Sequence, residues 1–172
     1  MKRLVCVLMA LVGLSAMVFA QDGGNSWYKD HLRIEADVGF GIVTTSFEVR
    51  SAYRAPITEN LRWDAGIHLS YEMPTLLAAI AGGGNVSSTN IKAFGSFWFW
   101  SFYVQYGLGV GFSDSGVCFN PYDIRLGFQP GINDNNGGHW NFKMELGLTG
   151  IPVKGYESNT NAFLTLGTTY RF

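Results

Sequence analysis

Three residues with chemically reactive side chains lie at alternate positions in the middle of the chain: His68, Ser70 and Glu72. Alternate residues of an extended strand point to the same face, so an imidazole, a hydroxyl and a carboxylate would line one side of that strand. Serine activated by a neighbouring base is a common arrangement for nucleophilic catalysis. These three residues are therefore candidate catalytic residues, and the spacing is a hypothesis until their geometry is known.

Charged side chains recur with the same two-residue spacing along most of the chain. In the stretch from Leu32 to Ile42, aliphatic and aromatic residues alternate with charged residues and glycine, and the stretch from Leu61 to Glu72 repeats the pattern most regularly. Such alternation is typical of strands that have one polar and one apolar face. The polar face carries Arg33, Glu35, Asp37, Glu48, Arg50, Arg62, Asp64, Asp123, Arg125, Lys143, Glu145 and Arg171.

About eight such stretches are visible, and their length of roughly ten residues matches strands that cross a bilayer. We expect an all-β, up-and-down antiparallel transmembrane β-barrel over residues 31–172. The register of residues 91–99 is ambiguous, because Phe94 and Trp98 lie on one face and Phe97 and Phe99 on the other. The stretches cover residues 32–42, 47–54, 61–72, 91–99, 102–112, 123–132, 140–149 and 162–172.

The orientation of the two faces decides between a membrane barrel and a soluble, lipocalin-like barrel that binds a ligand inside. An eight-stranded barrel has an interior just wide enough for ordinary side chains. The apolar face carries too many rings for that space, among them Trp63, Phe102, Phe142 and Tyr170. We therefore expect the rings to point outward in two aromatic belts, and the charges to point into the lumen as mutually paired groups.

The first residues have the features of an export signal. Lys2 and Arg3 precede an apolar run, and small residues lead to Ala20. This order predicts a signal peptide over residues 1–20, cleaved after Ala20, and a periplasmic segment over residues 21–30.

Composition and charge exclude several classes of function. Charged residues make up 15% of the chain, and loss of Lys2 and Arg3 with the signal would leave 10 basic and 13 acidic residues. No basic surface for nucleic acid is expected from this balance. Cys118 would be the single remaining cysteine, so no intramolecular disulfide, cysteine metal site or cofactor motif is predicted.

Two of the predicted outer loops are informative. The apolar segment 73–83 begins near Pro74 and runs into the three glycines 82–84, which suits either a short helix or a flexible loop. A second outer loop is expected over Ser113 to Pro121, before the stretch that begins at Asp123.

The last residues, Thr165 to Phe172, resemble the insertion signal of small outer-membrane β-barrels of Gram-negative bacteria. Gly167, Tyr170 and Phe172 match the glycine, the apolar position and the terminal aromatic of that signal. The resemblance covers about residues 31–172. It implies recognition by the barrel-assembly machinery, an outer-membrane location, contact with outer-membrane lipid and lipopolysaccharide, and outer loops that can meet a surface partner.

The spacing of His68 and Ser70 also resembles a pattern in outer-membrane lipid A deacylases, which implies histidine as base and serine as nucleophile. In the expected register, however, both residues face the lumen while a lipid would approach from the bilayer. We therefore expect a structural or surface-interaction barrel rather than an enzyme. A narrow pore of low conductance, a lipid-modifying hydrolase and a soluble binder are the alternatives.

Overall fold

The computed structural model describes residues 31–41, 44–75, 87–113, 116–130, 140–151 and 159–171. No helix in this part of the chain is long and apolar enough to cross a membrane. The strands are β1 (Leu32–Gly41), β2 (Thr44–Pro56), β3 (Leu61–Pro74), β4 (Ser88–Phe99), β5 (Phe102–Ser113), β6 (Gly116–Phe128), β7 (Trp140–Ile151) and β8 (Asn159–Arg171).

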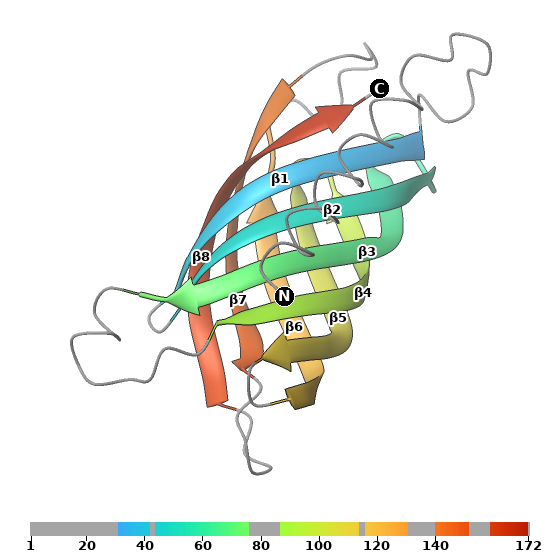
Figure 1. Cartoon of the computed structure of the whole chain (residues 1–172). Coiled ribbons are helices and arrows are strands. Elements are labelled where there is room, and N and C mark those ends of the chain that lie inside the picture. Colours follow the sequence, from blue (N-terminus) through green and yellow to red (C-terminus); the bar gives the residue numbers. More distant parts are fainter. Residues whose placement is uncertain are drawn as a thin grey trace, which may run out of the picture.

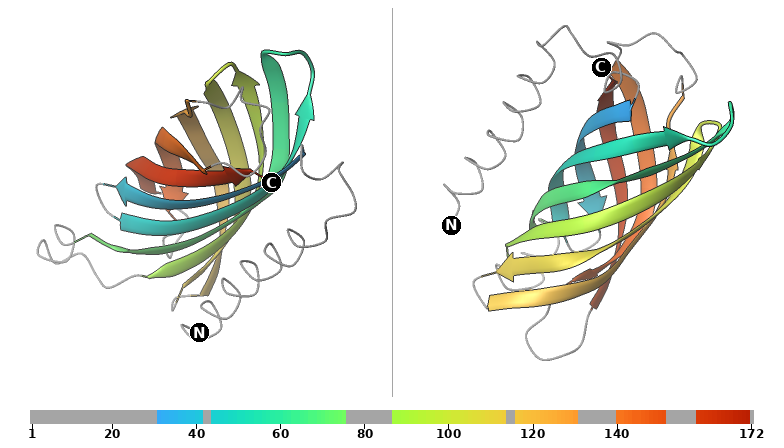
Figure 2. Two further views of the ribbon diagram at one scale, coloured as in Figure 1. Left: turned by 90° about the horizontal axis from the view of Figure 1, so that it is seen from above. Right: turned by 90° about the vertical axis from the view of Figure 1, so that its right-hand side faces the viewer.

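The eight strands form one closed barrel. Each strand pairs in antiparallel orientation with the next one along the chain, and β8 pairs with β1 to complete the ring. Figures 1 and 2 show the strands strongly inclined and wrapped around a common interior. Closure gives every strand a neighbour on both sides. The predicted eight-stranded, up-and-down, antiparallel barrel is confirmed.

The two ends of the barrel differ in their connections. At the end where β1 begins and β8 finishes, which we call the terminal end, the chain turns at Ile57–Asn60 and at Trp100–Ser101. The amide of Trp100 donates to the carbonyl of Asn60 at 2.9 Å and joins these two turns. The opposite end, where β1 finishes and β2 begins, is called the distal end.

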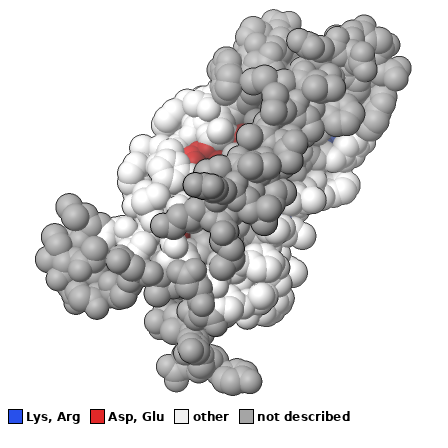
Figure 3. Space-filling view, viewed as in Figure 1, with Lys and Arg blue, Asp and Glu red and all other residues white. Residues whose placement is uncertain are grey.

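The outer wall of the barrel is apolar. Trp63, Phe102 and Phe142 are 42%, 59% and 53% exposed, whereas Glu145 is 1% exposed. Among the described Lys, Arg, Asp and Glu side chains, only Glu59 and Arg62, next to each other at the terminal end, are not buried. On the face that Figure 3 shows, the described surface is mostly white, with a small red patch of acidic side chains and a trace of blue. Most rings of the described strands lie outside and the charges lie inside, as the alternation predicts.

Strand β4 departs from the simple alternation of polar and apolar faces, which is why its register was ambiguous from the sequence. Its inward face carries Lys92, Phe94 and Trp98, and its outward face carries Phe97 and Phe99. Both faces therefore hold aromatic rings, because two large rings of this strand fill the interior. A period-two pattern cannot be read from such a strand.

Strand β6 begins earlier than expected. It starts at Gly116, so the prediction of a loop from Ser113 to Pro121 is wrong. Gly107 pairs with Asp123 and Gly109 with Asn120, so two residues of β6 oppose one residue of β5. This β-bulge takes up Pro121 and reverses which residues point inward on either side of it. The reversal hides the alternation from the sequence.

Several predictions fall on residues outside the described ranges. The predicted signal peptide 1–20 and the segment 21–30 lie there, as do Phe172 and most of the apolar segment 73–83. Pro74 itself is the last residue of β3.

Candidate functional site

The interior of the barrel is a dense group of charged side chains. Among the described residues, six cationic and seven acidic side chains are buried, so the two signs nearly balance. Buried charges are stable only when they are paired and hydrogen-bonded. The cations are Arg33, Arg50, Arg54, Lys92, Arg125 and Lys143, and the acids are Glu35, Asp37, Glu48, Asp64, Glu72, Asp123 and Glu145.

Arg50 on β2 is the centre of this network. Its guanidinium donates to both carboxylate oxygens of Glu145, with 2.6 Å between Nη2 and Oε2. Nη2 also lies 2.9 Å from Oε2 of Glu48 and 3.6 Å from Oδ2 of Asp37. Nη1 lies 3.5 Å from Oε2 of Glu35. One fully buried cation therefore links carboxylates from β1, β2 and β7 across the lumen.

Lys143 on β7 connects the same acids from the other side. Its Nζ contacts Glu35 and lies 2.5 Å from Oδ2 of Asp37 and 3.4 Å from Oε1 of Glu145. A compact ammonium with three donors can serve three carboxylates at once. Lys143 and Arg50 together neutralise the acids of β1 and β7.

The network continues toward the distal end through Arg125 and Lys92. Arg125 lies 2.6 Å from Glu48 and donates through Nε to Oδ1 of Asp123 at 2.6 Å. Lys92 donates to Oδ2 of Asp123 at 2.6 Å and to the hydroxyl of Thr149 at 3.1 Å. Strands β4, β6 and β7 are thereby tied together through the interior.

At the terminal end, an aromatic and cationic stack crosses the lumen. Arg33 lies 2.7 Å from Oδ2 of Asp64, and Nε of Arg54 donates to Oδ1 of the same carboxylate at 2.9 Å. Both guanidiniums lie over the indole of Trp98, at 4.5 Å and 4.9 Å from its centroid. Tyr103 stacks on Trp98 with 4.0 Å between centroids. Cation–π contacts of this kind are strongest where water is excluded.

Glycines make room for the rings inside. A Cβ at Gly127 would overlap the ring of Tyr103, and a Cβ at Gly147 would overlap the ring of Phe163. Phe163 in turn lies under the guanidinium of Arg125, which is 4.5 Å from the ring centroid. Gly127 and Gly147 are thus required by large inward side chains on the neighbouring strands.

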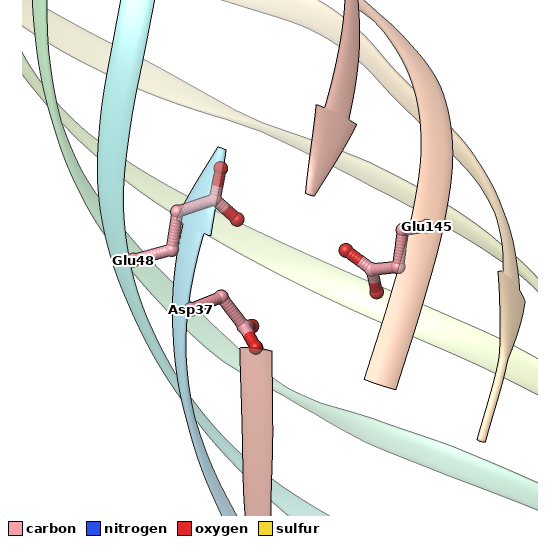
Figure 4. A group of neighbouring side chains, drawn as sticks. All are labelled: Asp37, Glu48 and Glu145. Carbon is pink, nitrogen blue, oxygen red and sulfur yellow. The ribbon is translucent and has the colours of Figure 1, made fainter. Parts of the chain in front are cut away.

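Three carboxylates of the network approach one another closely enough to resemble a metal site. Asp37, Glu48 and Glu145 offer oxygen atoms within 4.8 Å of one another, and Figure 4 shows them pointing to the same part of the lumen. Arg50 contacts all three carboxylates, and Lys143 contacts two of them. These two cations already supply the positive charge that a metal ion would bring, so the group is explained as part of the charge network.

The candidate catalytic residues all face the lumen. His68, Ser70 and Glu72 are at most 4% exposed. The imidazole lies close to acids on other strands: Nε2 is 3.1 Å from Glu48 and Nδ1 is 3.9 Å from Asp123. The hydroxyl of Ser70 accepts from the amide of Asn90 at 3.3 Å. The described contacts thus place the histidine in the charge network, and the hydrolase stays a prediction.

Most of the residues assigned to the lumen from the sequence are brought together in this network. Arg62 is different: it is half-buried at the terminal end and donates to the carbonyl of Glu59 at 3.3 Å.

Of the predicted insertion signal, Gly167 packs so closely on Asp37 that a Cβ there would overlap that carboxylate. The side chains of Tyr170 and Arg171 lie outside the described part of the structure.

Similarity to known proteins gives no assignment for this barrel. No known family model matches the chain, and no curated protein is significantly similar to it. Its function must therefore be inferred from the distribution of charge and apolar surface described above.

Sequence reasoning left Lys92, Arg54 and Trp98 out of the lumen network. Lys92 and Trp98 lie on β4, where rings on both faces conceal which residues point inward. Arg54 alternates correctly with Arg50 on β2 but lies just before Pro56, where the strand was expected to end. The two-residue spacing that runs from Arg50 through Ala52 to Arg54 could have predicted that Arg54 points into the lumen.

Proposed function

We propose that this chain is an integral outer-membrane β-barrel protein with a structural or surface-interaction role, whose lumen is filled by paired charges. The observation that carries the proposal is the reversed distribution of polarity, with charge inside and an apolar wall outside. A soluble protein of this size would expose charged side chains over its surface and bury its rings.

The wall has the size and chemistry that a bilayer requires. The strands contain 10 to 14 residues, and a tilted strand of about 9–11 residues crosses the hydrocarbon region. Every strand is paired, which is a requirement for backbone in hydrocarbon. Ile67, Leu126 and Leu146, on the outer wall, are 58%, 60% and 60% exposed.

Exposed aromatic rings gather toward both ends of this wall. Trp63, Phe99 and Phe102 lie toward the terminal end, while Phe47 and Phe112 lie toward the distal end. Aromatic belts of this kind occupy the two interfaces between hydrocarbon and water in membrane barrels. The predicted signal peptide and the resemblance of the C-terminal strand to an insertion signal support export and assembly in the outer membrane.

A filled lumen favours a structural or interaction role over a pore. Arg50, Lys143 and Arg125 connect strands across the interior by direct contacts between side chains. An eight-stranded barrel leaves little space beyond such side chains. Recognition would then depend on the loops of the distal end, the end opposite the chain termini.

The proposal can be tested by placing one charge on the wall. Leu146→Arg puts a cation in the middle of the apolar wall, where contact with hydrocarbon would cost about 2–4 kcal/mol. Ile57→Arg is the matched control, because Ile57 is 51% exposed in a turn at the terminal end. We expect the Leu146→Arg chain to insert poorly into lipid vesicles and the Ile57→Arg chain to insert like the wild type.

The same two variants also distinguish a membrane barrel from a soluble one. A wall in contact with water would accept arginine at Leu146 without loss, since exposed substitutions usually change stability by less than about 0.5 kcal/mol. Equal vesicle insertion of the two variants, or recovery of both as soluble folded monomers without lipid, would refute the membrane proposal.

A further inference from the structure

One strand of the barrel is paired along only part of its length on one side. β6 begins at Gly116 and pairs with β5 from that residue onward. Its pairs with β7 begin only at Asp123, which lies opposite Thr149, and β7 ends at Ile151. Among the described residues, none pairs with residues 116–120 on the side that faces away from β5. In the described part of the chain, these residues therefore present a strand edge at the distal end of the barrel.

This edge, residues 116–120, lacks the features that usually keep a strand edge from pairing. Natural β-sheet proteins protect their edges with charged side chains and proline. The edge reads Gly-Val-Cys-Phe-Asn and contains neither. Val117 and Phe119 are 66% and 64% exposed, the two highest values among the large apolar side chains of the described chain. An exposed apolar edge of this kind is a template for pairing with another strand.

The sequence of the edge is complementary to itself in antiparallel orientation. When Cys118 lies opposite Cys118 of a second copy, Val117 of each copy lies opposite Phe119 of the other. Pairs of an aromatic and a β-branched side chain are favourable across neighbouring strands, and no like charges are brought together. Within one chain, Val117 already pairs with Phe112 and Phe119 with Val110. The apolar face of the sheet would thus continue from one copy into the other.

We propose that residues 116–120 pair with the same residues of a second copy of this chain and join the two barrels in one antiparallel sheet. Two identical antiparallel strands in one sheet are related by a two-fold axis perpendicular to that sheet. The sheet here is the wall of the barrel, so the rotation reverses the direction of the barrel axis. The two barrels therefore meet through their distal ends and extend away from each other.

In a bilayer, this arrangement joins barrels from two facing membranes rather than neighbours in one membrane. This step rests on the proposed membrane function, whereas the pairing of the two edges does not. The edge is short, so a single contact is weak. Many contacts between two surfaces reinforce one another, because each one holds the next pair of edges close together. Membranes that carry many copies would thus adhere to one another.

Chemical cross-linking through Cys118 tests the pairing of the two edges. Cys6→Ser leaves Cys118 as the single cysteine of the full chain. A short bismaleimide should join two of these folded chains in detergent into a covalent dimer, because the register places the two Cys118 residues opposite each other. The triple variant Cys6→Ser/Cys118→Ser/Glu59→Cys carries its one cysteine in a turn at the terminal end and should remain monomeric.

Two changes within the edge test its register. Phe119→Lys, added to Cys6→Ser, removes both apolar pairs at once and should lower the dimer yield about tenfold. Val117→Glu added to Phe119→Lys places each lysine opposite a glutamate of the second copy and should restore the dimer. Ile57→Lys, in a turn at the terminal end, is the matched control and should cross-link as Cys6→Ser does.

A Cys6→Ser chain that stays monomeric with the bismaleimide would overturn the proposal, as would a dimer yield that Phe119→Lys leaves unchanged. Phosphatidylcholine vesicles test the contact between membranes, with flotation to measure insertion and turbidity to measure clustering. The wild type should cluster vesicles and Phe119→Lys should not. Inserted wild type that leaves the vesicles dispersed would overturn the contact between membranes. Failure to insert would instead contradict the membrane function, and cross-linking in detergent would still decide the pairing.

Discussion

Arg50 shows how a fully buried charge can be stable inside a narrow barrel. Its guanidinium reaches four carboxylates, and those carboxylates are shared with Lys143 and Arg125. Such a pair contributes little over a well-packed apolar core, but the loss of one partner leaves an uncompensated charge. The network is therefore sensitive to the loss of any one of its members.

Replacement of Arg50 should be far more damaging than replacement of an arginine at the rim. Arg50→Met leaves Glu145 without its closest cation and removes one of the two arginines at Glu48. It should lower the free energy of unfolding by about 3–5 kcal/mol. Arg62→Met, at the half-buried rim, should lower it by less than about 1 kcal/mol. Urea unfolding followed by tryptophan fluorescence measures both values. Similar losses for the two variants would show that the interior network does not stabilise the fold.

At the scale of single strands, regular alternation made most of the barrel predictable. In β1, β2, β3, β5, β7 and β8 one face is polar or glycine-rich and the other apolar, so the inward residues follow from the spacing alone. Strand β4 could not be read this way, because Phe94 and Trp98 fill the lumen beside Lys92. The early start of β6 was hidden by the bulge at Pro121, which shifts the alternation by one residue.

The sequence predicts most of the residues that point into the lumen, but not which of them form ion pairs with one another. Sequence spacing shows that Arg50 and Glu145 point inward, but not that they meet, since 95 residues separate them along the chain. Their contact depends on the stagger between strands all around the barrel, which a single sequence does not reveal.

Packing between β5 and β6 gives a test at this scale. Gly127→Ala should destabilise the barrel by about 1–3 kcal/mol, because the new Cβ would overlap the ring of Tyr103. Gly95→Ala is the matched control on the outer wall, where the nearest atom to a new Cβ is 3.8 Å away.

A double variant separates this clash from the general effect of losing a glycine. Tyr103→Leu shortens the side chain, so Gly127→Ala should cost less in that background than in the wild type. Equal costs in both backgrounds would contradict the packing described for these two strands.

For the whole molecule, the decisive property is that polarity is reversed relative to a soluble protein. Thirteen charged side chains of the described chain are buried, whereas rings and aliphatic side chains cover the wall from end to end. Hydrocarbon around the barrel would remove the cost of exposing that wall to water, about 25 cal/mol for each Å². A surrounding bilayer would explain the apolar outer surface of the sheet. The paired charges that fill the lumen explain its polar inner surface.

The most direct measurement is fractionation of Gram-negative cells that produce the full chain. We expect recovery in the outer-membrane fraction, with resistance to extraction by alkaline carbonate, because the apolar wall would be held by lipid rather than by polar contacts. Recovery as a soluble, folded monomer in the periplasm would contradict the account.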